Sequence, residues 1–213
     1  MAKKKNSWKD HYTSRAKDEK WLARSVYKLE EIDKKYKFIK KGCRILDLGC
    51  YPGSWTQYCL KKLGNNGEII GIDLNRPTRF KARNFRFIAA DILELDPGQL
   101  AGEVGQLDAV ISDLAPNTTG NSIADTARSM ELVEKALEIA LSVLKKEAHF
   151  LCKIFEGEDL KGFKDRVSAH FNNVRLIRPA AVRKKSREVY LIGMDMIDQN
   201  SPSKDGEIFF KEV

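Results

Sequence analysis

The chain has 213 residues, 42% of them hydrophobic, and a formal net charge of +8 at pH 7. No apolar stretch approaches the roughly 20 residues of a membrane-spanning helix, and no apolar secretory core follows the first lysines, which argues against membrane and secreted proteins. The four cysteines and three histidines have no metal-ligand spacing, so we expect reduced thiols, no metal site and one soluble, cytoplasmic domain.

Excess positive charge is concentrated at the N-terminal end of the chain. Residues 1–41 carry 14 Lys and Arg against 6 Asp and Glu, which accounts for the whole net excess. We expect residues 1–22 to form a basic arm. Residues 24–36 follow with helical periodicity, and this helix turns its apolar residues inward and places Lys28 on another face.

From residue 43 the pattern alternates β-type runs with helical segments, as in a parallel sheet covered by helices. Strands are expected at residues 43–48, 68–72, 85–89, 108–112, 149–154, 174–177 and 189–194. Helices are expected at residues 54–63, 126–144 and 160–171. The predicted fold class is α/β, Rossmann-like, with a mostly parallel seven-stranded sheet, helices on both faces and an added N-terminal helix. This domain covers residues 23–197, and residues 198–213 are expected to form a loosely attached tail.

The loop after the first predicted strand is the candidate cofactor site. In such a sheet a ligand lies at the carboxyl ends of the strands. The loop carries Asp47, Gly49 and Gly53 but has no G-x-G-x-x-G pattern, so the phosphate cradle of an NAD-dependent oxidoreductase is missing. An acidic residue beside a glycine turn suits a ligand that is positively charged and has no phosphate. S-adenosylmethionine fits this description.

Two further acidic residues end the next two strands. Asp73 is placed where it could bind ribose hydroxyls, and Asp91 where it could meet the amino edge of adenine. An Asp at a strand end is also an ordinary helix cap. Acidic residues at three successive strand ends nevertheless favour an adenosyl ligand.

Lys153 lies within an apolar run, Phe150-Leu151-Cys152-Lys153-Ile154-Phe155. Burying an unpaired ammonium group is costly. The lysine therefore either extends to water at the strand end or is held by carboxylates for chemistry. Asp113 ends the fourth strand and Glu188 begins the last one, so both could flank Lys153.

A second basic cluster lies near the C-terminal end of the domain. It consists of Arg175, Arg178, Arg183, Lys184, Lys185 and Arg187. Two concentrations of positive charge indicate a polyanion-binding protein. The alternative is a solvated face together with a disordered basic arm.

Five segments stand in order at suitable distances along the chain. They are Arg24-Ser25-Val26-Tyr27-Lys28-Leu29, Asp47-Leu48-Gly49 with Pro52-Gly53-Ser54-Trp55, Ser112-Asp113-Leu114-Ala115-Pro116-Asn117, Lys153-Ile154-Phe155-Glu156-Gly157 and Ser186-Arg187-Glu188-Val189-Tyr190. Together they resemble the FtsJ/RrmJ-like RNA 2′-O-methyltransferases over roughly residues 8–195. The resemblance implies a Lys-Asp-Lys-Glu tetrad at Lys28, Asp113, Lys153 and Glu188. It implies cofactor contacts from Gly53, Trp55, Asp73, Asp91 and Asp113. The loop Cys50-Tyr51-Pro52-Gly53-Ser54-Trp55 departs from the family's usual small residue followed by Pro-Gly-Gly-Trp.

The resemblance also implies a reaction, the transfer of a methyl group from S-adenosylmethionine to a ribose 2′-hydroxyl. Lys153 is expected to accept the hydroxyl proton, with Asp113 and Glu188 orienting it. Lys28 is expected to stabilise negative charge on the oxygen or to hold the nucleotide. No metal is required.

The expected partner is RNA rather than DNA, because only RNA carries the 2′-hydroxyl. Compact relatives resemble bacterial-type enzymes that act on a uridine of 23S ribosomal RNA, so we expect this substrate within a large-subunit (50S) particle or ribosome, and a monomeric enzyme. A transfer-RNA 2′-O-methyltransferase is the first alternative. A non-catalytic RNA-binding ribosome assembly factor is the second, although no member of the tetrad is missing.

Overall fold

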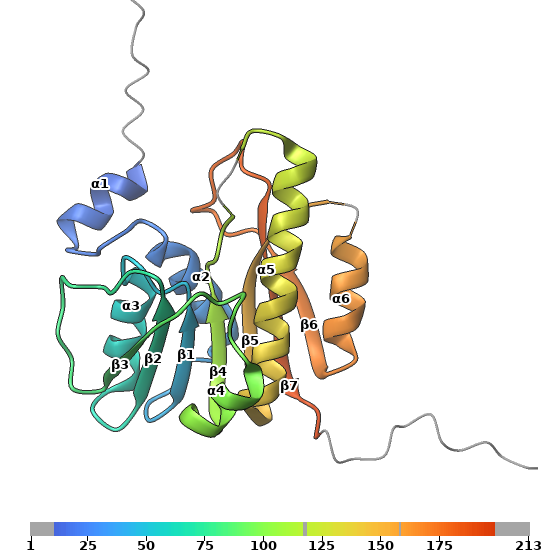
Figure 1. The fold of residues 1–213 in the computed structure, drawn as a ribbon. Coiled ribbons are helices and arrows are strands. Elements are labelled where there is room, and N and C mark those ends of the chain that lie inside the picture. The colour runs from blue at the N-terminus through green and yellow to red at the C-terminus, as the bar shows by residue number, and fades with distance from the viewer. Residues whose placement is uncertain (1–10, 117–118, 158, 199–213) are drawn as a thin grey trace, which may run out of the picture.

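The computed structural model describes residues 11–116, 119–157 and 159–198. The strands are Arg44–Leu48 (β1), Glu68–Asp73 (β2), Phe85–Ala89 (β3), Leu107–Ser112 (β4), Leu144–Phe155 (β5), Phe171–Ile177 (β6) and Glu188–Met196 (β7). The helices are His11–Asp18 (α1), Val26–Tyr36 (α2), Ser54–Leu63 (α3), Pro97–Val104 (α4), Ser122–Val143 (α5) and Leu160–Ser168 (α6). Figure 1 shows the strands as a central sheet with helices packed against it.

The seven strands form one sheet in the order β3-β2-β1-β4-β5-β7-β6. All neighbouring pairs from β3 to β5 are parallel, and β7 runs antiparallel to both β5 and β6. The predicted mostly parallel, seven-stranded Rossmann-like sheet is therefore confirmed. Strand order reverses beside β1, so the carboxyl ends of β1 and β4 border the crevice in which such sheets bind ligands.

The core has two layers, one on each face of the sheet. Side chains of α4, α5 and α6 pack with alternate residues of the strands in one buried cluster. Side chains of α1, α2 and α3 pack with the intervening strand residues in the other. Because successive strand residues point to opposite faces, Phe150 and Cys152 belong to the first layer and Leu151 to the second. Lys153 therefore points toward the layer that contains α2 and α3.

Several element boundaries differ from the sequence-based expectation. The predicted helix at 160–171 ends at Ser168, because Phe171 is buried and already pairs with Met196 in the sheet. The long helix starts earlier than residue 126, since the Asn121 side chain accepts hydrogen bonds from the backbone N–H groups of Ile123 and Ala124. Such side-chain caps favour a helix start that apolar periodicity does not reveal.

Two helices were not predicted. Helix α4 buries only Leu100 and Val104, too few positions to produce a clear periodicity, although Asp96 caps it and Pro97 opens it. Helix α1 lies within the predicted basic arm, and its Tyr12 packs against Tyr27 with ring centroids 5.5 Å apart. Residues 1–10 of the arm and residues 199–213 of the predicted tail lie outside the described residues. Within the described ranges, no helix is long and apolar enough to cross a membrane.

Candidate active site

Strand register brings three residues of the predicted tetrad to one face of the sheet. Lys153 stands opposite Tyr190 in the β5–β7 pair, and Glu188 precedes Tyr190 by two residues on the same strand. Asp113 directly follows Ser112, the last residue at which β4 pairs with β5. Residues two apart on a strand share a face. The carboxyl edge of β4 and β5 and the start of β7 thus present Asp113, Lys153 and Glu188 together.

The four tetrad residues form a chain of alternating charges. Lys153 Nζ lies 3.2 Å from Asp113 Oδ1 and donates a hydrogen bond of 2.6 Å to the Asp113 backbone carbonyl. Lys28 Nζ lies 2.5 Å from Glu188 Oε1 and 4.0 Å from Asp113 Oδ1. Their side chains are only 7% (Lys153), 18% (Asp113), 10% (Lys28) and 14% (Glu188) exposed. Sequence patterns had placed Glu188 beside Lys153, whereas the structure pairs Glu188 with Lys28.

Tyr190 is a further member of this site that the sequence analysis did not single out. Its hydroxyl donates a 2.6 Å hydrogen bond to Asp113 Oδ1, and its side chain is fully buried. Burial, and then the nearby Asp113 and Glu188, raise the pKa of Tyr190 well above its usual value, which keeps the phenol a neutral donor. Its position two residues after Glu188 puts it on the same face of the predicted strand, and this was the signal by which the sequence could have revealed it.

Replacing Tyr190 by phenylalanine tests this hydrogen bond. The change keeps the aromatic ring that packs against Trp55. It removes the hydroxyl group that donates the 2.6 Å hydrogen bond to Asp113. Because a hydrogen bond to a charged group contributes about 1.5–3 kcal/mol, we expect kcat to fall about 10-fold and the melting temperature to drop by several degrees. Steady-state kinetics and thermal unfolding measure both, and an unchanged kcat would show that Asp113 is positioned by its lysines alone.

Helix α2, which carries Lys28, is attached to the start of α3. The Trp55 indole N–H donates to the Ser25 carbonyl at 2.9 Å, and the hydroxyls of Ser25 and Ser54 are 2.9 Å apart. Trp55 is 3% exposed, so its indole lies inside the protein. These contacts fix the position of Lys28 relative to the glycine loop before α3. Ser54, which departs from the family pattern, supplies one of them.

The loop after β1 is held in shape by glycine and by a buried carboxyl group. Gly49 and Gly53 have φ values of +76° and +107°, a conformation that favours glycine. Asp47 is 1% exposed and accepts a 2.7 Å hydrogen bond from the Thr56 hydroxyl of α3. The structure therefore places Asp47 beneath the loop, where it supports the turn from inside.

Burial raises the pKa of Asp47 to about 7. Between the unfolded pKa of about 4 and this value, the unfolded chain releases a proton that the folded chain keeps, so the buried carboxyl lowers stability progressively as pH rises through that window. We expect Asp47→Asn to become more stable relative to the native chain as pH rises. The difference in their free energy of unfolding should grow by a few kcal/mol between pH 4 and pH 8. Urea unfolding of both proteins at several pH values measures this difference, and a pH-independent difference would contradict it.

Asp73 and Asp91 lie at the same edge of the sheet. The Asp73 carboxylate accepts hydrogen bonds from the backbone N–H groups of Tyr51 at 3.0 Å and Asn75 at 2.8 Å. Asp91 is exposed and accepts one from the Leu93 N–H at 3.0 Å. Each carboxylate offers about four lone-pair positions. Both therefore keep acceptor capacity for a ligand, and these two carboxylates fit a cationic ligand with hydroxyl and amino groups better than a phosphate.

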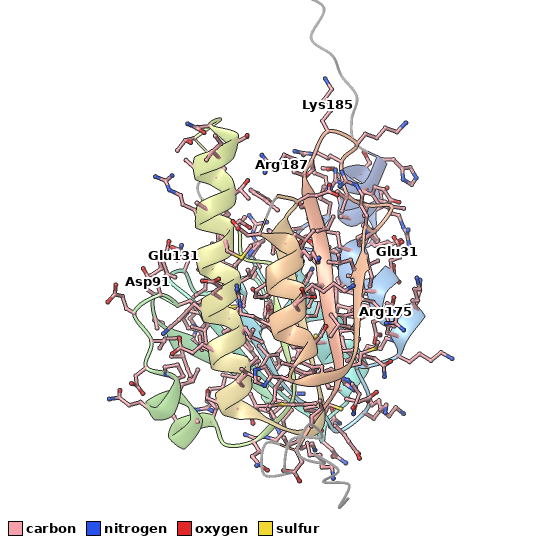
Figure 2. All side chains as sticks on the ribbon, turned by 90° about the vertical axis from the view of Figure 1, so that its right-hand side faces the viewer. Glu31, Asp91, Glu131, Arg175, Lys185 and Arg187 are labelled. Carbon is pink, nitrogen blue, oxygen red and sulfur yellow. The ribbon has the colours of Figure 1, made fainter. Side chains whose placement is uncertain are left out.

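A basic pocket opens beside Lys28 and Glu188. It has a volume of about 430 Å³ and is lined by Arg24, Ser25, Lys28, Arg183, Lys185, Ser186 and Glu188. Figure 2 shows Lys185 at the top of the molecule, above Arg187, which directly precedes the start of β7. Residues 24–28, at the start of α2, and the β6–β7 connection thus bring residues of both predicted basic regions to one cavity. Its mouth suits an anionic ligand that reaches the tetrad.

The second predicted basic cluster is divided by the structure. The Arg187 guanidinium donates to the carbonyls of Ser122 and Glu156 and to the Thr126 hydroxyl, so it holds α5 against the loop after β5. Arg175 lies on the edge strand β6, well below Lys185 in Figure 2. The part of this cluster that borders the pocket is therefore Arg183 and Lys185. Asn117, the last residue of the motif that contains Asp113, lies outside the described residues.

Comparisons with known proteins identify the family of the chain. The chain matches the model of the FtsJ-like methyltransferase family over residues 21–196. A ribosomal RNA large subunit methyltransferase E from Desulfosudis oleivorans is 45% identical over 184 residues, which cover 86% of this chain and 89% of the relative. A relative of the same description from Bdellovibrio bacteriovorus is 45% identical over 189 residues, with 87% and 96% covered.

A solved structure supports the same relationship. A Plasmodium falciparum protein, provisionally described as a ribosomal RNA methyltransferase, superposes with a TM-score of 0.72 at 30% identity and covers 83% of this chain and 98% of its own. The match in sequence, length and fold confirms the resemblance inferred from the motifs. The chain belongs to the FtsJ-like methyltransferase family.

Proposed function

We propose that this protein transfers a methyl group from S-adenosylmethionine to the 2′-hydroxyl of a uridine in 23S ribosomal RNA. The observation that carries the proposal is the Asp113 carboxylate, which lies between Lys153 and Lys28 at the carboxyl edge of the sheet. Two relatives of nearly the same length are described as large-subunit ribosomal RNA methyltransferases, which supports the choice of RNA.

S-adenosylmethionine fits the residues at the strand ends. Asp73 and Asp91 would bind its hydroxyl and amino groups, the Gly49–Gly53 turn would approach it through the backbone, and Asp113 would border its charged part. Asp47 and Trp55 would act from inside, by holding the turn and α2 in place. When bound, the cofactor supplies a methyl carbon attached to positively charged sulfur, which is the electrophile.

The chain's own residues would prepare the nucleophile. Lys153 Nζ would accept the proton of the 2′-hydroxyl as that oxygen becomes the nucleophile. Asp113 then stabilises the resulting ammonium group at 3.2 Å. Lys28 offers positive charge to the developing oxyanion, while Glu188 fixes its direction from 2.5 Å. Low exposure of all four side chains strengthens these interactions by excluding water.

The pocket beside Lys28 would admit the target nucleotide. Its cationic lining would attract the phosphate groups of RNA, and Lys28, which lines it, would meet the target ribose. A single nucleotide can enter such a pocket when it is unstacked from its neighbours, as for other enzymes that modify nucleotides. The substrate is therefore expected to be a loop or junction that can present one ribose.

The test is a transfer assay with radiolabelled cofactor on two kinds of substrate. Large-subunit ribosomal particles are expected to accept label, and purified transfer RNA is not. Label on transfer RNA alone would identify a transfer-RNA methyltransferase instead. If neither RNA is labelled while RNA still binds, the protein is an assembly factor without activity. Calorimetry is expected to detect binding of S-adenosylmethionine but not of NAD, and the reverse result would overturn the cofactor assignment.

A further inference from the structure

The connection between β2 and β3 carries a third concentration of positive charge. Residues 74–84 include four cations and no acidic residue, namely Arg76, Arg79, Lys81 and Arg83, and all four are exposed. We refer to these four residues as the β2–β3 basic surface. Within the described ranges, none of the four forms an ion pair with a carboxylate. Arg86, the next cation along the chain, lies in β3, 3.0 Å from Glu103 and 3.7 Å from Glu68. These two nearby carboxylates thus pair with a cation of β3 and not with the β2–β3 basic surface.

The connection is anchored to the cofactor turn by apolar contacts. The rings of Phe80 and Phe85 have centroids 5.2 Å apart. A Cβ atom added to Gly53 would lie 2.5 Å from Phe80 Cε1 and 3.1 Å from Pro77 Cβ. Phe80 therefore lies directly against the turn. Since Arg79 and Lys81 are its chain neighbours, their charges are held beside the cofactor site by packing.

The β2–β3 basic surface and the basic pocket lie on opposite sides of the tetrad. The sheet order separates β2 from β7 by four strand spacings, or about 19 Å. In Figure 1 the β2–β3 connection forms the left edge of the molecule, whereas the β6–β7 connection lies at the top near the centre. A nucleic-acid strand that crosses the tetrad from the pocket would next meet the ends of β1 and β2.

We propose that the β2–β3 basic surface binds phosphates of the substrate RNA beyond the target nucleotide, on the cofactor side of the site. The proposal rests on the proposed function, and it assigns the substrate a path across the whole carboxyl edge. Exposed cations that are not paired with carboxylates attract a polyanion and read no sequence, because phosphate contacts only position the strand. Four like charges within eight residues repel one another, and bound phosphates would relieve this repulsion.

The test compares two double variants with equal loss of charge. Arg79→Gln with Lys81→Gln removes two cations of the proposed surface. Lys145→Gln with Lys146→Gln is the matched control, since both lysines are exposed and stand at the start of β5, at the opposite edge of the sheet. Each protein is assayed for methyl transfer to large-subunit particles, and for retention of protein-free 23S RNA on filters as a function of salt.

The first double variant is expected to raise KM for the particle about 10-fold at unchanged kcat. It is also expected to make the fall of log affinity with log salt less steep, by about 1.4 in slope. The control is expected to match the native chain. Calorimetry with S-adenosylhomocysteine should give equal affinities for all three proteins. An unchanged KM and salt slope would overturn the proposal, as would a weaker cofactor affinity, which would show that the residues act through the Gly53 turn. If the native chain itself fails to methylate RNA, the proposed function fails, and the filter assay still decides whether this surface binds RNA.

Discussion

Replacing Lys153 by methionine is expected to lower kcat for methyl transfer by about 1,000-fold or more. Positioned proton acceptors contribute about 100- to 10,000-fold, and Lys153 also directs the nucleophile toward the cofactor. Methionine keeps the length of the side chain in a site that exposes only 7% of it, so the fold has no reason to change. Affinity for S-adenosylmethionine is expected to stay within a few-fold, because Lys153 contacts Asp113 rather than the glycine turn.

The matched control is Lys145→Met. Lys145 lies at the other end of the same strand, where its ammonium group is 2.6 Å from Asp108. This variant loses a lysine from β5 without touching the tetrad, and its kcat is expected to equal that of the native chain. If Lys153→Met retained turnover within a few-fold of the control, its role as proton acceptor would be wrong.

Replacing Asp113 by asparagine is expected to impair both activity and folding. One Asp113 carboxylate oxygen lies 3.2 Å from Lys153 Nζ, 4.0 Å from Lys28 Nζ and 2.6 Å from the Tyr190 hydroxyl. An amide removes the negative charge, so Lys153 loses Asp113 as a carboxylate partner while Lys28 keeps Glu188. We expect kcat to fall at least about 100-fold and the free energy of unfolding to drop by about 3 kcal/mol. Stopped-time transfer assays and urea unfolding measure the two effects.

The double variant Asp113→Asn with Lys153→Met separates the catalytic from the structural role. If the two residues act as one unit, the double variant should transfer methyl groups no more slowly than Lys153→Met alone. It should also recover part of the lost stability, because the buried charge that lacked a partner is gone. Additive losses in kcat would show that Asp113 acts independently of Lys153.

Much of the site could be predicted from sequence because it follows from strand periodicity. Asp113 and Lys153 each stand at the carboxyl end of a predicted strand, and parallel strands bring such ends to one edge. Glu188 stands at the start of β7 and reaches the same edge because β7 runs antiparallel to β5. The fold class could be predicted for a similar reason, since alternating strands and helices leave few possible arrangements of the chain.

The pairing within the site could not be predicted in this way. Whether Glu188 meets Lys28 or Lys153 depends on how far α2 reaches over the sheet, and this is set by the contact of Ser25 with Trp55. The burial of Asp47 depends on Thr56 of α3 lying above it. Contacts between a helix and a strand end involve tertiary geometry, for which a single sequence provides no periodic signal.

The most direct test of the account is to locate the methyl group on the RNA. Large-subunit particles are incubated with the protein and labelled S-adenosylmethionine, and the extracted 23S RNA is hydrolysed in alkali and separated. Alkaline cleavage needs a free 2′-hydroxyl, so a 2′-O-methylated nucleotide remains joined to its neighbour. We predict that the label appears in an alkali-resistant dinucleotide whose first nucleoside is uridine, and that Lys153→Met abolishes it. Label released in single nucleotides would place the methyl group on a base and contradict the proposed chemistry.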